Sequence, residues 1–479
     1  MGCMLTRSGT GERFARPSNL GAMNASSVAI ARQVAVYPTN VSLQMVEGAS
    51  VRRRGASDVR WTRRRRHRDH LTVVSLFAGA GGLDLGLEAA GFKVRLCVES
   101  DEDARETLRA NRPRWKLSEP GDIHELEPAD ILRQASLRRR SVTLISGGPP
   151  CQPFSKSGYW SNGASAGLED PRADTIRAYL KVVEAALPKV FLFENVSGFA
   201  FNGKDEGLQL ILRGTAAINR RQGTSYRPQV IHLNAADYGV PQIRQRLFIL
   251  AHINGKQIEV PSPTHGPLEQ AGNAVVPYHT AWDAIGDLDR ERFPAELRPK
   301  GKWAALLPSI PEGRNYLWHT PRSGGQPLFG WRTRYWSFLL KLTKDEPSWT
   351  IQAEPGPATG PFHWRSRPLS IKELTRLQTF PRGYRVVGTR QSAQRQVGNA
   401  VPCAVGELLG LEIRRQLLGH RVRRKLRLIP ARRGRRPPPE ALRPVPARYM
   451  KLRGKHRAHP GVGRGPRARA RSRRRAVSR

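Results

Sequence analysis

The chain has 479 residues, enough for one large domain with a smaller one beside it. Its 81 lysines and arginines exceed 39 acidic residues and give a net charge of +42, which favours a polyanionic partner, nucleic acid first. The four cysteines are far apart and form no CxxC pair, so they suggest neither a disulfide framework nor a zinc cage, and no apolar run approaches the ~20 residues of a membrane span.

The positive charge is concentrated at the two ends of the chain. Residues 1–70 carry 13 basic and 4 acidic residues, a net charge of +9, and residues 414–479 carry 25 basic residues and one acid, Glu440, a net charge of +24. Neither end has a clear hydrophobic period, and the arginine-rich tail repels itself. We therefore expect both basic ends to be disordered, with the tail adding salt-dependent, sequence-independent affinity for a polyanion.

Regular elements are expected from Leu71 onward. Apolar runs predict buried strands, and a period of 3.6 residues predicts helices between them. The expected strands are 71–77, 94–98, 142–146, 190–193, 229–233 and 247–251, and the expected helices are 83–90, 101–110 and 175–186. This alternation predicts an α/β fold with a parallel, doubly wound sheet.

The pattern changes after about residue 255. Proline, glycine and tryptophan dominate, and helical periodicity returns only at residues 370–377 and 401–418. The change predicts a smaller irregular module inserted before the chain returns to its first domain. The expected divisions are an N-terminal extension 1–70, a main domain 71–265, the smaller module 266–366, a return 367–413 and a tail 414–479.

The first expected strand ends in a glycine-rich turn, residues 77–83 (FAGAGGL). Glycines between a strand and a helix let the backbone approach a ligand. Glu99, at the end of the next strand, can accept both hydroxyls of a ribose, and Asp122 with Ile123 can contact an adenine edge. On these residues alone a dinucleotide-dependent oxidoreductase and a purely structural turn stay open, although the glycines do not spell GxGxxG.

A second motif, residues 147–155 (GGPPCQPFS), follows the strand at 142–146. Its prolines make a rigid loop that presents one thiol, Cys151, beside the turn described above. A thiol in that setting indicates a nucleophile. Cys97 and Cys403 fall inside a strand and a helix, where packing in the core is the expected role.

Two charged motifs complete the pattern. Glu194, in residues 193–196 (FENV), follows a strand and is expected to face Cys151. Arg244 and Arg246, in residues 242–246 (QIRQR), alternate along the chain and so lie on one side of it. They suit a phosphate or a pyrimidine carbonyl oxygen, and a surface ion pair is the alternative.

These motifs together resemble the bacterial type of cytosine-C5 DNA methyltransferase. The resemblance covers about residues 72–413 in the family's usual order, and it includes residues 367–381 (RPLS…E…RLQ…FP) and 396–402 (QVGNAVP). It implies a Rossmann-like methyltransferase domain, a target-recognition domain at 266–366, and S-adenosylmethionine as the methyl donor. No metal is implied.

The resemblance also implies a role for individual residues. Cys151 adds to C6 of a flipped-out cytosine, Glu194 protonates N3 and needs a raised pKa, and Arg246 binds O2. Arg244 fixes the catalytic loop or a phosphate. The residues expected around the cofactor are Phe77, Gly79, Ala80, Gly82, Leu83, Glu99, Ser100, Asp122, Ile123, Pro150, Asn399 and Ala400. Ser100 stands where many relatives carry a larger side chain, so adenine stacking is expected to be weaker there.

DNA contacts are expected at two places. Gln152 and Ser155 begin a glycine-containing segment, residues 155–170, that is expected to close over the flipped base. Arg332 and Arg334, in residues 331–336 (WRTRYW), are expected to read guanine edges in the major groove. The alternative for this segment is that its aromatic residues only form the core of the smaller module.

The implied partner is double-stranded DNA, bound by a monomer in the prokaryotic cytoplasm, in association with the nucleoid and without membrane contact. A restriction-modification context is expected, with a cognate endonuclease acting separately. Two alternatives stay open. One is a tRNA cytosine-C5 methyltransferase, and the other is a non-catalytic DNA-binding relative, which would require the loss of Cys151, Glu194 or Arg246.

Overall fold

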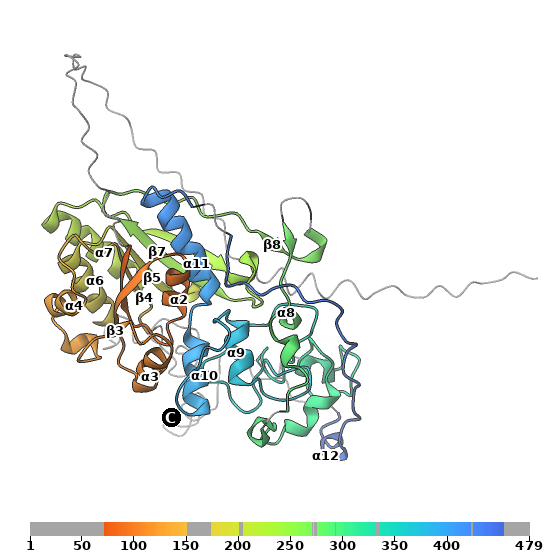
Figure 1. Ribbon diagram of the computed structural model, residues 1–479. Coiled ribbons are helices and arrows are strands. Elements are labelled where there is room, and N and C mark those ends of the chain that lie inside the picture. The colour runs from red at the N-terminus through yellow and green to blue at the C-terminus, as the bar shows by residue number, and fades with distance from the viewer. Residues whose placement is uncertain are drawn as a thin grey trace, which may run out of the picture. The chain divides into compact units, whose positions relative to one another are not determined.

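A computed structural model describes residues 71–454 apart from 151–173, 201–204, 271, 273–274, 293, 331–334 and 423–424 (Figure 1). Seven strands form one sheet in the order β3-β2-β1-β4-β5-β7-β6. Their bounds are β1 Thr72–Leu76, β2 Lys93–Val98, β3 Lys116–Leu117, β4 Leu144–Gly147, β5 Val190–Val196, β6 Gln229–Asn234 and β7 Gln245–His252. The doubly wound α/β fold is thereby confirmed.

The direction of β7 corrects the expectation of a wholly parallel sheet. Strands β1 to β5 pair in parallel, but β7 lies between β5 and β6 and runs antiparallel to both. Only residues 235–244 connect β6 to β7, and a parallel crossover needs a dozen or more residues. The short connection therefore forces the chain to turn back beside β6.

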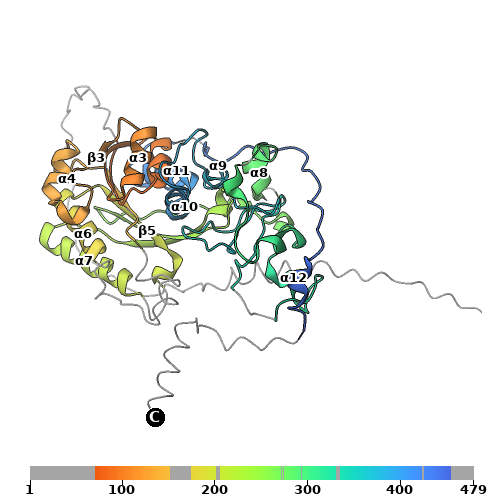
Figure 2. The same cartoon turned by 90° about the horizontal axis from the view of Figure 1, so that it is seen from below.

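Helices cover both faces of the sheet (Figures 1 and 2). One face carries α2 (Gly82–Ala89), α3 (Glu102–Asn111) and α11 (Cys403–Glu412), and the other carries α4 (Pro128–Gln134), α6 (Asp174–Ala186) and α7 (Glu206–Gln222). Alternation along β5 explains the two layers: Val190 and Leu192 belong to one hydrophobic core, whereas Phe191 and Phe193 belong to the other. Cys97 and Cys403 are fully buried, as expected.

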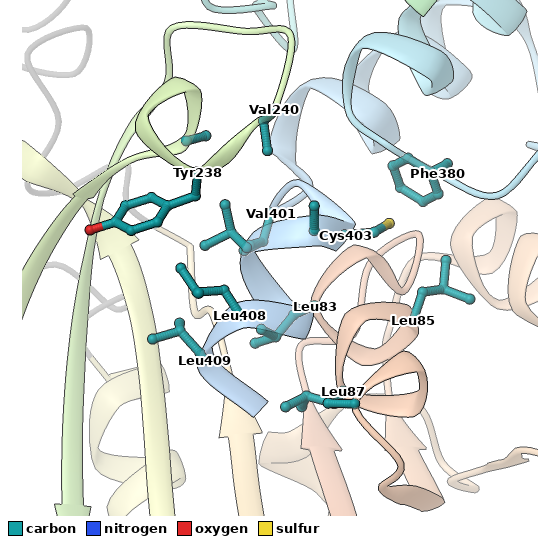
Figure 3. Packing of buried hydrophobic residues seen from close by; sticks show 14 of the residues in the cluster. Leu83, Leu85, Leu87, Tyr238, Val240, Phe380, Val401, Cys403, Leu408 and Leu409 are labelled. Carbon is teal, nitrogen blue, oxygen red and sulfur yellow. The ribbon is translucent and has the colours of Figure 1, made fainter. Parts of the chain in front are cut away.

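Helices α2 and α11 pack at unusually close range (Figure 3). A Cβ on Gly86 would stand 2.2 Å from the Cys403 carbonyl oxygen, and a Cβ on Gly82 would stand 2.3 Å from the Val401 carbonyl oxygen. Only glycine allows this approach, which brings the end of the chain's return segment against the first glycine turn. The predicted helix at 401–418 is split, because Ile413–Leu417 form a π-helical turn after α11.

The second part of the molecule is irregular. Short 3₁₀ turns such as Ala304–Ser309 and Tyr316–His319 surround a separate core of aromatic and aliphatic side chains. That core contains Leu306, Leu307, Ile310, Tyr316, Leu328, Phe329, Phe338, Leu339, Phe362 and Tyr449. Helices α8 (Ala281–Ile285) and α9 (Ile371–Leu377) instead join the core of the sheet, and α10 (Arg390–Asn399) leads into α11.

The C-terminal tail differs from its predicted disorder. Residues 425–454, here named the C-terminal strap, follow a defined path and end in α12 (Ala447–Met450). Tyr449 of α12 is only 5% exposed because it completes the aromatic core of the smaller module. The remaining basic ends, residues 1–70 and 455–479, lie outside the described residues. None of the helices in the described part of the chain is both long and apolar enough to cross a membrane.

Candidate active site

The candidate site lies at the carboxyl ends of β1, β2, β4 and β5. The strand order reverses between β1 and β4, since β2 and β3 lie on one side of β1 and β4 and β5 lie on the other. Loops that leave neighbouring parallel strands on opposite sides diverge at such a point and leave room for a ligand. The glycine turn, Glu99, the start of the proline loop and Glu194 lie at these strand ends, whereas the arginine motif at 242–246 leads into β7.

Glu99 ties the end of β2 to the glycine turn. Its Oε2 accepts a hydrogen bond from the Gly79 backbone N–H at 2.7 Å, and its Oε1 accepts one from the Asp101 N–H at 2.8 Å. Burial raises the pKa of Glu99, against the lowering effect of those two backbone donors. Each carboxylate oxygen has a second acceptor position, so both ribose hydroxyls can still be bound.

The turn itself leaves space for a ligand. Gly79 has φ +54°, and apart from residues 78–80 no atom of the described residues lies within 4 Å of the position a Cβ would take. Phe77 also has a positive φ of 56°, which a non-glycine residue adopts only where its surroundings fix it. An open backbone turn beside an acidic side chain fits the sugar and methionine parts of S-adenosylmethionine.

The adenine residues lie next to Glu99. A Cβ on Gly121 would stand 2.5 Å from the Glu99 carbonyl oxygen, so Asp122 and Ile123 follow directly beside the end of β2. Ile123 is buried, and Asp122 Oδ1 accepts from the His124 N–H at 2.9 Å. Ser100 is exposed at the same edge.

The return segment, residues 367–413, also reaches the glycine turn. The Cβ that Gly82 lacks would lie 3.1 Å from the Ala400 Cβ, which puts Asn399 and Ala400 beside the glycine turn. The Tyr384 hydroxyl donates to the Ala80 carbonyl at 2.8 Å, and this hydrogen bond stabilises the glycine turn. The cofactor residues predicted from distant parts of the sequence are thus brought together.

Glu194 and Arg246 form the polar centre of the site. Arg246 Nε lies 2.9 Å from Glu194 Oε1, and both side chains are nearly buried, at 13% and 11% exposed. Burial raises the pKa of Glu194, and the positive charges of Arg246 and Arg244 only partly offset that effect. A carboxyl group with a raised pKa can hold a proton near neutrality, which is what donation to a base nitrogen requires.

The proline loop approaches this pair from β4. A Cβ on Gly148 would stand 2.8 Å from Glu194 Oε2, and the Asn195 side-chain amide donates to the Pro149 carbonyl at 3.3 Å. Pro150 is the last described residue of the loop. The chain that continues into Cys151 therefore leaves from beside the Glu194 carboxyl, although Cys151 itself lies outside the described residues.

Arg244 is buried, which speaks against one of its two predicted roles, contact with a phosphate. Its side chain is 1% exposed and donates to the carbonyls of Ile351 at 3.1 Å, Gly398 and Ala400 at 3.0 Å. Because the guanidinium is held among backbone carbonyls inside the protein, it does not reach a phosphate. It joins the start of β7 to the smaller module and to the segment that ends at Ala400.

The predicted DNA contacts Gln152, Ser155, Arg332 and Arg334, together with the closing segment 155–170, lie outside the described residues. Two described neighbours are informative: Tyr335 is 60% exposed and Trp336 46% exposed. These two rings are therefore not core residues, whereas Trp331, the third aromatic residue of the segment, lies outside the described residues. Trp336 meets Trp349 edge to face, with 5.6 Å between ring centroids.

Two residues of the site were missed from the sequence. Tyr384 shows no local pattern that would connect it with the glycine turn. Asp84 lies in α2 and is 1% exposed, and burial raises its pKa to about 6, against hydrogen bonds from Ser75 and Ser146. A charged residue within an otherwise apolar helix face, residues 83–87, was the only available signal.

Comparison with known proteins gives consistent matches. The family described as C-5 cytosine-specific DNA methylase matches residues 71–415. The type II methyltransferase M.SacI of Streptomyces achromogenes is 36% identical over 373 residues, 72% of this chain and 93% of that protein. M.AquIA of Picosynechococcus is 41% identical over 233 residues, 47% of this chain and 92% of that protein.

Solved structures share the fold. An E. coli prophage protein described as a DNA modification methyltransferase has a TM-score of 0.53 at 22% identity and covers 73% of this chain and 99% of its own. A DNMT2 variant from Spodoptera frugiperda has a TM-score of 0.50 at 17% identity, with 71% and 99% covered. At these identities the likeness concerns the architecture alone.

Proposed function

The chain belongs to the C-5 cytosine-specific DNA methylase family, and from that premise we propose that it methylates a flipped-out cytosine within a fixed sequence of double-stranded DNA. It is a DNA (cytosine-5-)-methyltransferase, and S-adenosylmethionine is its cofactor. The observation that carries the finer proposal is the buried Glu194–Arg246 pair beside the loop that runs into Cys151.

The cofactor supplies an electrophilic methyl group, and the protein has to make C5 of cytosine nucleophilic. In the proposed reaction the Cys151 thiolate adds to C6 and forms a covalent Cys151–C6 bond. Negative charge then develops on the ring, and Glu194 neutralises it by donating its proton to N3. Once C5 carries the methyl group, a water molecule takes the C5 proton, the C5–C6 double bond re-forms as the Cys151–C6 bond breaks, Cys151 leaves as the thiolate, and the N3 proton returns to Glu194.

Arg246 is proposed to bind the cytosine O2. Its contact with Glu194 supports this role, because a single base edge presents N3 and O2 side by side. The same guanidinium also limits how far the pKa of Glu194 rises. A flipped base that accepts a hydrogen bond from Arg246 would compete with Glu194 for that donor and further favour the protonated carboxyl.

Arg244 is proposed as a positioning residue. It holds Ile351, Gly398 and Ala400 by their carbonyls, and Ala400 borders the cofactor turn. Through this contact the start of β7, which carries Arg246, keeps a fixed place relative to the cofactor residues.

Sequence reading is proposed to occur in the smaller module. Residues 348–351 run beside residues 241–244, since Ile243 N–H donates to the Ser348 carbonyl at 2.8 Å and Thr350 Oγ1 donates to the Ile243 carbonyl at 2.7 Å. Trp349 in this segment supports exposed Trp336. Exposed Trp336 is therefore linked through Trp349 to the segment that leads into β7 and Arg246. This link supports contact with DNA next to the target base, where aromatic side chains stack or wedge between bases.

Several relatives are named type II methyltransferases, which supports the proposal that this chain is the modification enzyme of a restriction-modification system. The test is to express the full chain in a host without cytosine-C5 methylation and map 5-methylcytosine across the genome. Methylation at one short sequence, absent with Cys151→Ser, is expected. Methylation confined to tRNA, or no methylation by the parental protein, would refute the proposal.

A further inference from the structure

The C-terminal strap lies outside the segment that matches the family, which ends at residue 415. Its ten lysines and arginines and one acid would ordinarily be taken as a nucleic-acid-binding tail. Figure 1 shows a different arrangement: the strap leaves the sheet domain near α11, passes α8 and ends at α12 beside the smaller module. Each of these three places has specific contacts.

The first contact gives two hydrogen bonds to a buried acid of the sheet domain. Glu407 in α11 is fully buried, and its Oε2 accepts hydrogen bonds from the backbone N–H groups of Arg427 at 2.9 Å and Leu428 at 3.0 Å. Arg427 also donates to the Ala89 carbonyl at the end of α2, at 2.6 Å. A buried carboxylate is costly unless hydrogen bonds satisfy it, so the beginning of the strap is part of the folded domain.

The second contact is with α8. The Arg433 backbone N–H donates to Asp283 Oδ1 at 2.8 Å, and its Nε donates to the Asp283 carbonyl at 2.9 Å. The Arg433 guanidinium also lies 2.8 Å from Asp287, which contacts Arg376 of α9 at 3.5 Å. Burial alone would raise the pKa of Asp283, but hydrogen bonds from His279, Arg433 and Thr280 lower it below the ordinary value.

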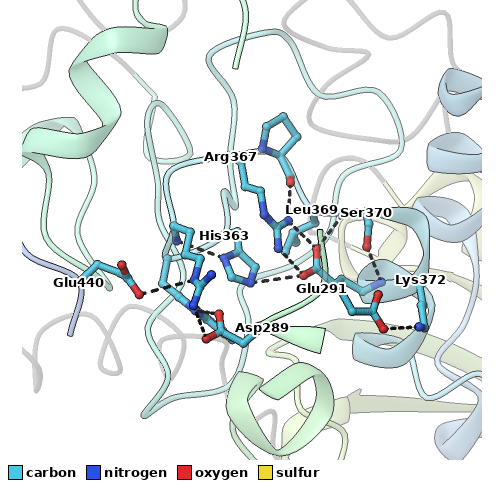
Figure 4. A network of polar contacts seen from close by, with 12 residues as sticks. Asp289, Glu291, His363, Arg367, Leu369, Ser370, Lys372 and Glu440 are labelled. Carbon is cyan, nitrogen blue, oxygen red and sulfur yellow. Dashed lines mark hydrogen bonds and ion pairs between the residues drawn. The ribbon is translucent and has the colours of Figure 1, made fainter. Parts of the chain in front are cut away.

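Further along, the strap meets charged residues of the smaller module. Arg436 pairs with Asp345 at 2.7 Å, and the Glu440 backbone N–H donates to Glu312 Oε1 at 2.9 Å. Figure 4 shows Glu440 next to a network that includes Asp289, His363 and Arg367. Arg365 connects Glu440 to this network, since its guanidinium lies 3.6 Å from the Glu440 carboxylate and 2.9 Å from the Asp289 carboxylate.

The last contact completes the core of the smaller module. The Tyr449 ring stacks on Trp303, with 5.8 Å between centroids and 14° between planes. Its hydroxyl donates to the Lys302 carbonyl at 2.5 Å. Removing such an aromatic side chain leaves a cavity and exposes apolar surface.

We propose that the C-terminal strap is an intramolecular brace that holds the smaller module on the sheet domain and so fixes the module's position for reading DNA. The part of this proposal that concerns DNA rests on the proposed function. Four of the strap's ten basic side chains pair with acids of the folded chain, namely Arg427, Arg432, Arg433 and Arg436. These ion pairs within the molecule compete with DNA phosphates for the four side chains.

A matched pair of substitutions separates a brace from a charged tail. Arg433→Ala and Arg435→Ala each remove one positive charge, two residues apart. Arg435 is exposed, and no ion pair of its side chain occurs among the described residues. A brace predicts that Arg433→Ala increases amide hydrogen exchange across residues 303–362 and raises KM for duplex DNA several-fold, while Arg435→Ala changes neither. Equal effects of the two substitutions would overturn the proposal.

Tyr449→Ala tests the other end of the brace in the full chain. We expect faster exchange in residues 303–362 and a raised KM for DNA, with Tyr449→Phe close to the parental protein because the ring stack is kept. A chain that ends at residue 454 loses ten basic residues of the tail but keeps the strap, so only its low-salt DNA affinity should fall. Parental-like exchange in Tyr449→Ala would refute the brace. Hydrogen exchange needs no DNA, so it tests whether the strap stabilises the smaller module even if the parental protein methylates nothing.

Discussion

Replacing Glu194 by glutamine distinguishes proton donation from hydrogen bonding at the centre of the site. Glutamine has nearly the same shape and keeps an oxygen that can accept from Arg246 Nε, now 2.9 Å from Glu194 Oε1. It cannot donate the full proton that charge neutralisation at N3 requires. We expect kcat to fall by roughly 10²–10⁴-fold, the range for a positioned general acid, or about 3–5 kcal/mol in the activation barrier.

The same substitution should leave the fold intact. The pKa of Glu194 is raised despite the nearby arginines, which means that burial penalises its charged form more than Arg246 and Arg244 favour it. A neutral side chain of the same size therefore removes no net favourable charge interaction. The free energy of unfolding of Glu194→Gln should stay within about 1 kcal/mol of the parental value, as for other nearly isosteric substitutions.

The pH dependence of kcat tests whether Glu194 acts in its protonated form. Because the folded pKa is raised above the ordinary value of 4.5, the carboxyl keeps its proton to higher pH, and parental kcat should decline as pH rises through that raised pKa. The glutamine variant should lack this decline. The measurement is single-turnover methyl transfer against pH with cofactor and DNA saturating.

Glu184→Gln is the matched control, because Glu184 pairs with Arg221 at 2.7 Å on the surface of α6 and α7, far from these strand ends. It should keep the parental kcat and pH profile. If Glu194→Gln lost less than threefold in kcat, or kept the same pH profile as the parental protein, Glu194 would not be the proton donor.

Three further predictions follow from the site. Cys151→Ser should abolish methyl transfer and covalent trapping on DNA while cofactor affinity stays within about twofold, because a hydroxyl is far less acidic than a thiol; measurable turnover would remove Cys151 from the nucleophile role. Asp84→Asn should raise the free energy of unfolding at pH 7 by up to about 3 kcal/mol, since the folded pKa of about 6 against 3.8 means that stability is lost as pH rises between these values; urea titrations at pH 4 and 7 that show no such difference would contradict it. Arg244→Lys should weaken cofactor binding and lower the melting temperature, because an ammonium cannot span the three carbonyls; unchanged values for both would make the contact dispensable.

Six of the strands and the helices α2, α3 and α6 could be predicted from the sequence, because apolar runs and glycine turns are local signals. The short strand β3 and the helices α4 and α7 were missed. The meeting of Glu194 and Arg246 at one base was implied by the family resemblance, but it did not follow from the parallel sheet that we expected. Arg246 lies at the start of β7, and only an antiparallel β7 brings that start to the carboxyl end of β5, where Val196 pairs with Arg246. In the parallel sheet that was expected, Arg246 would lie at the opposite edge from Glu194.

The C-terminal strap could not be predicted for a related reason. Composition describes the positive charge of the strap correctly. The acids that bind the strap, Asp283, Asp287 and Glu407, are distant from it in the sequence, and no local sequence pattern indicates that they would contact it. Arg244 shows the same limit, since its motif indicates an anion site while the fold surrounds it with carbonyl groups.

The close packing of α11 on α2 also has a consequence during synthesis. Helix α2 is made early, yet Gly82 and Gly86 contact backbone that the ribosome adds only at residues 401–406. Until then Leu83 and Leu87 have no α11 to cover them, and Asn399 with Ala400 is missing from the cofactor turn. We therefore expect a prematurely released chain to expose this apolar surface to chaperones and proteases, and we expect activity only after almost the whole matched region has been synthesised.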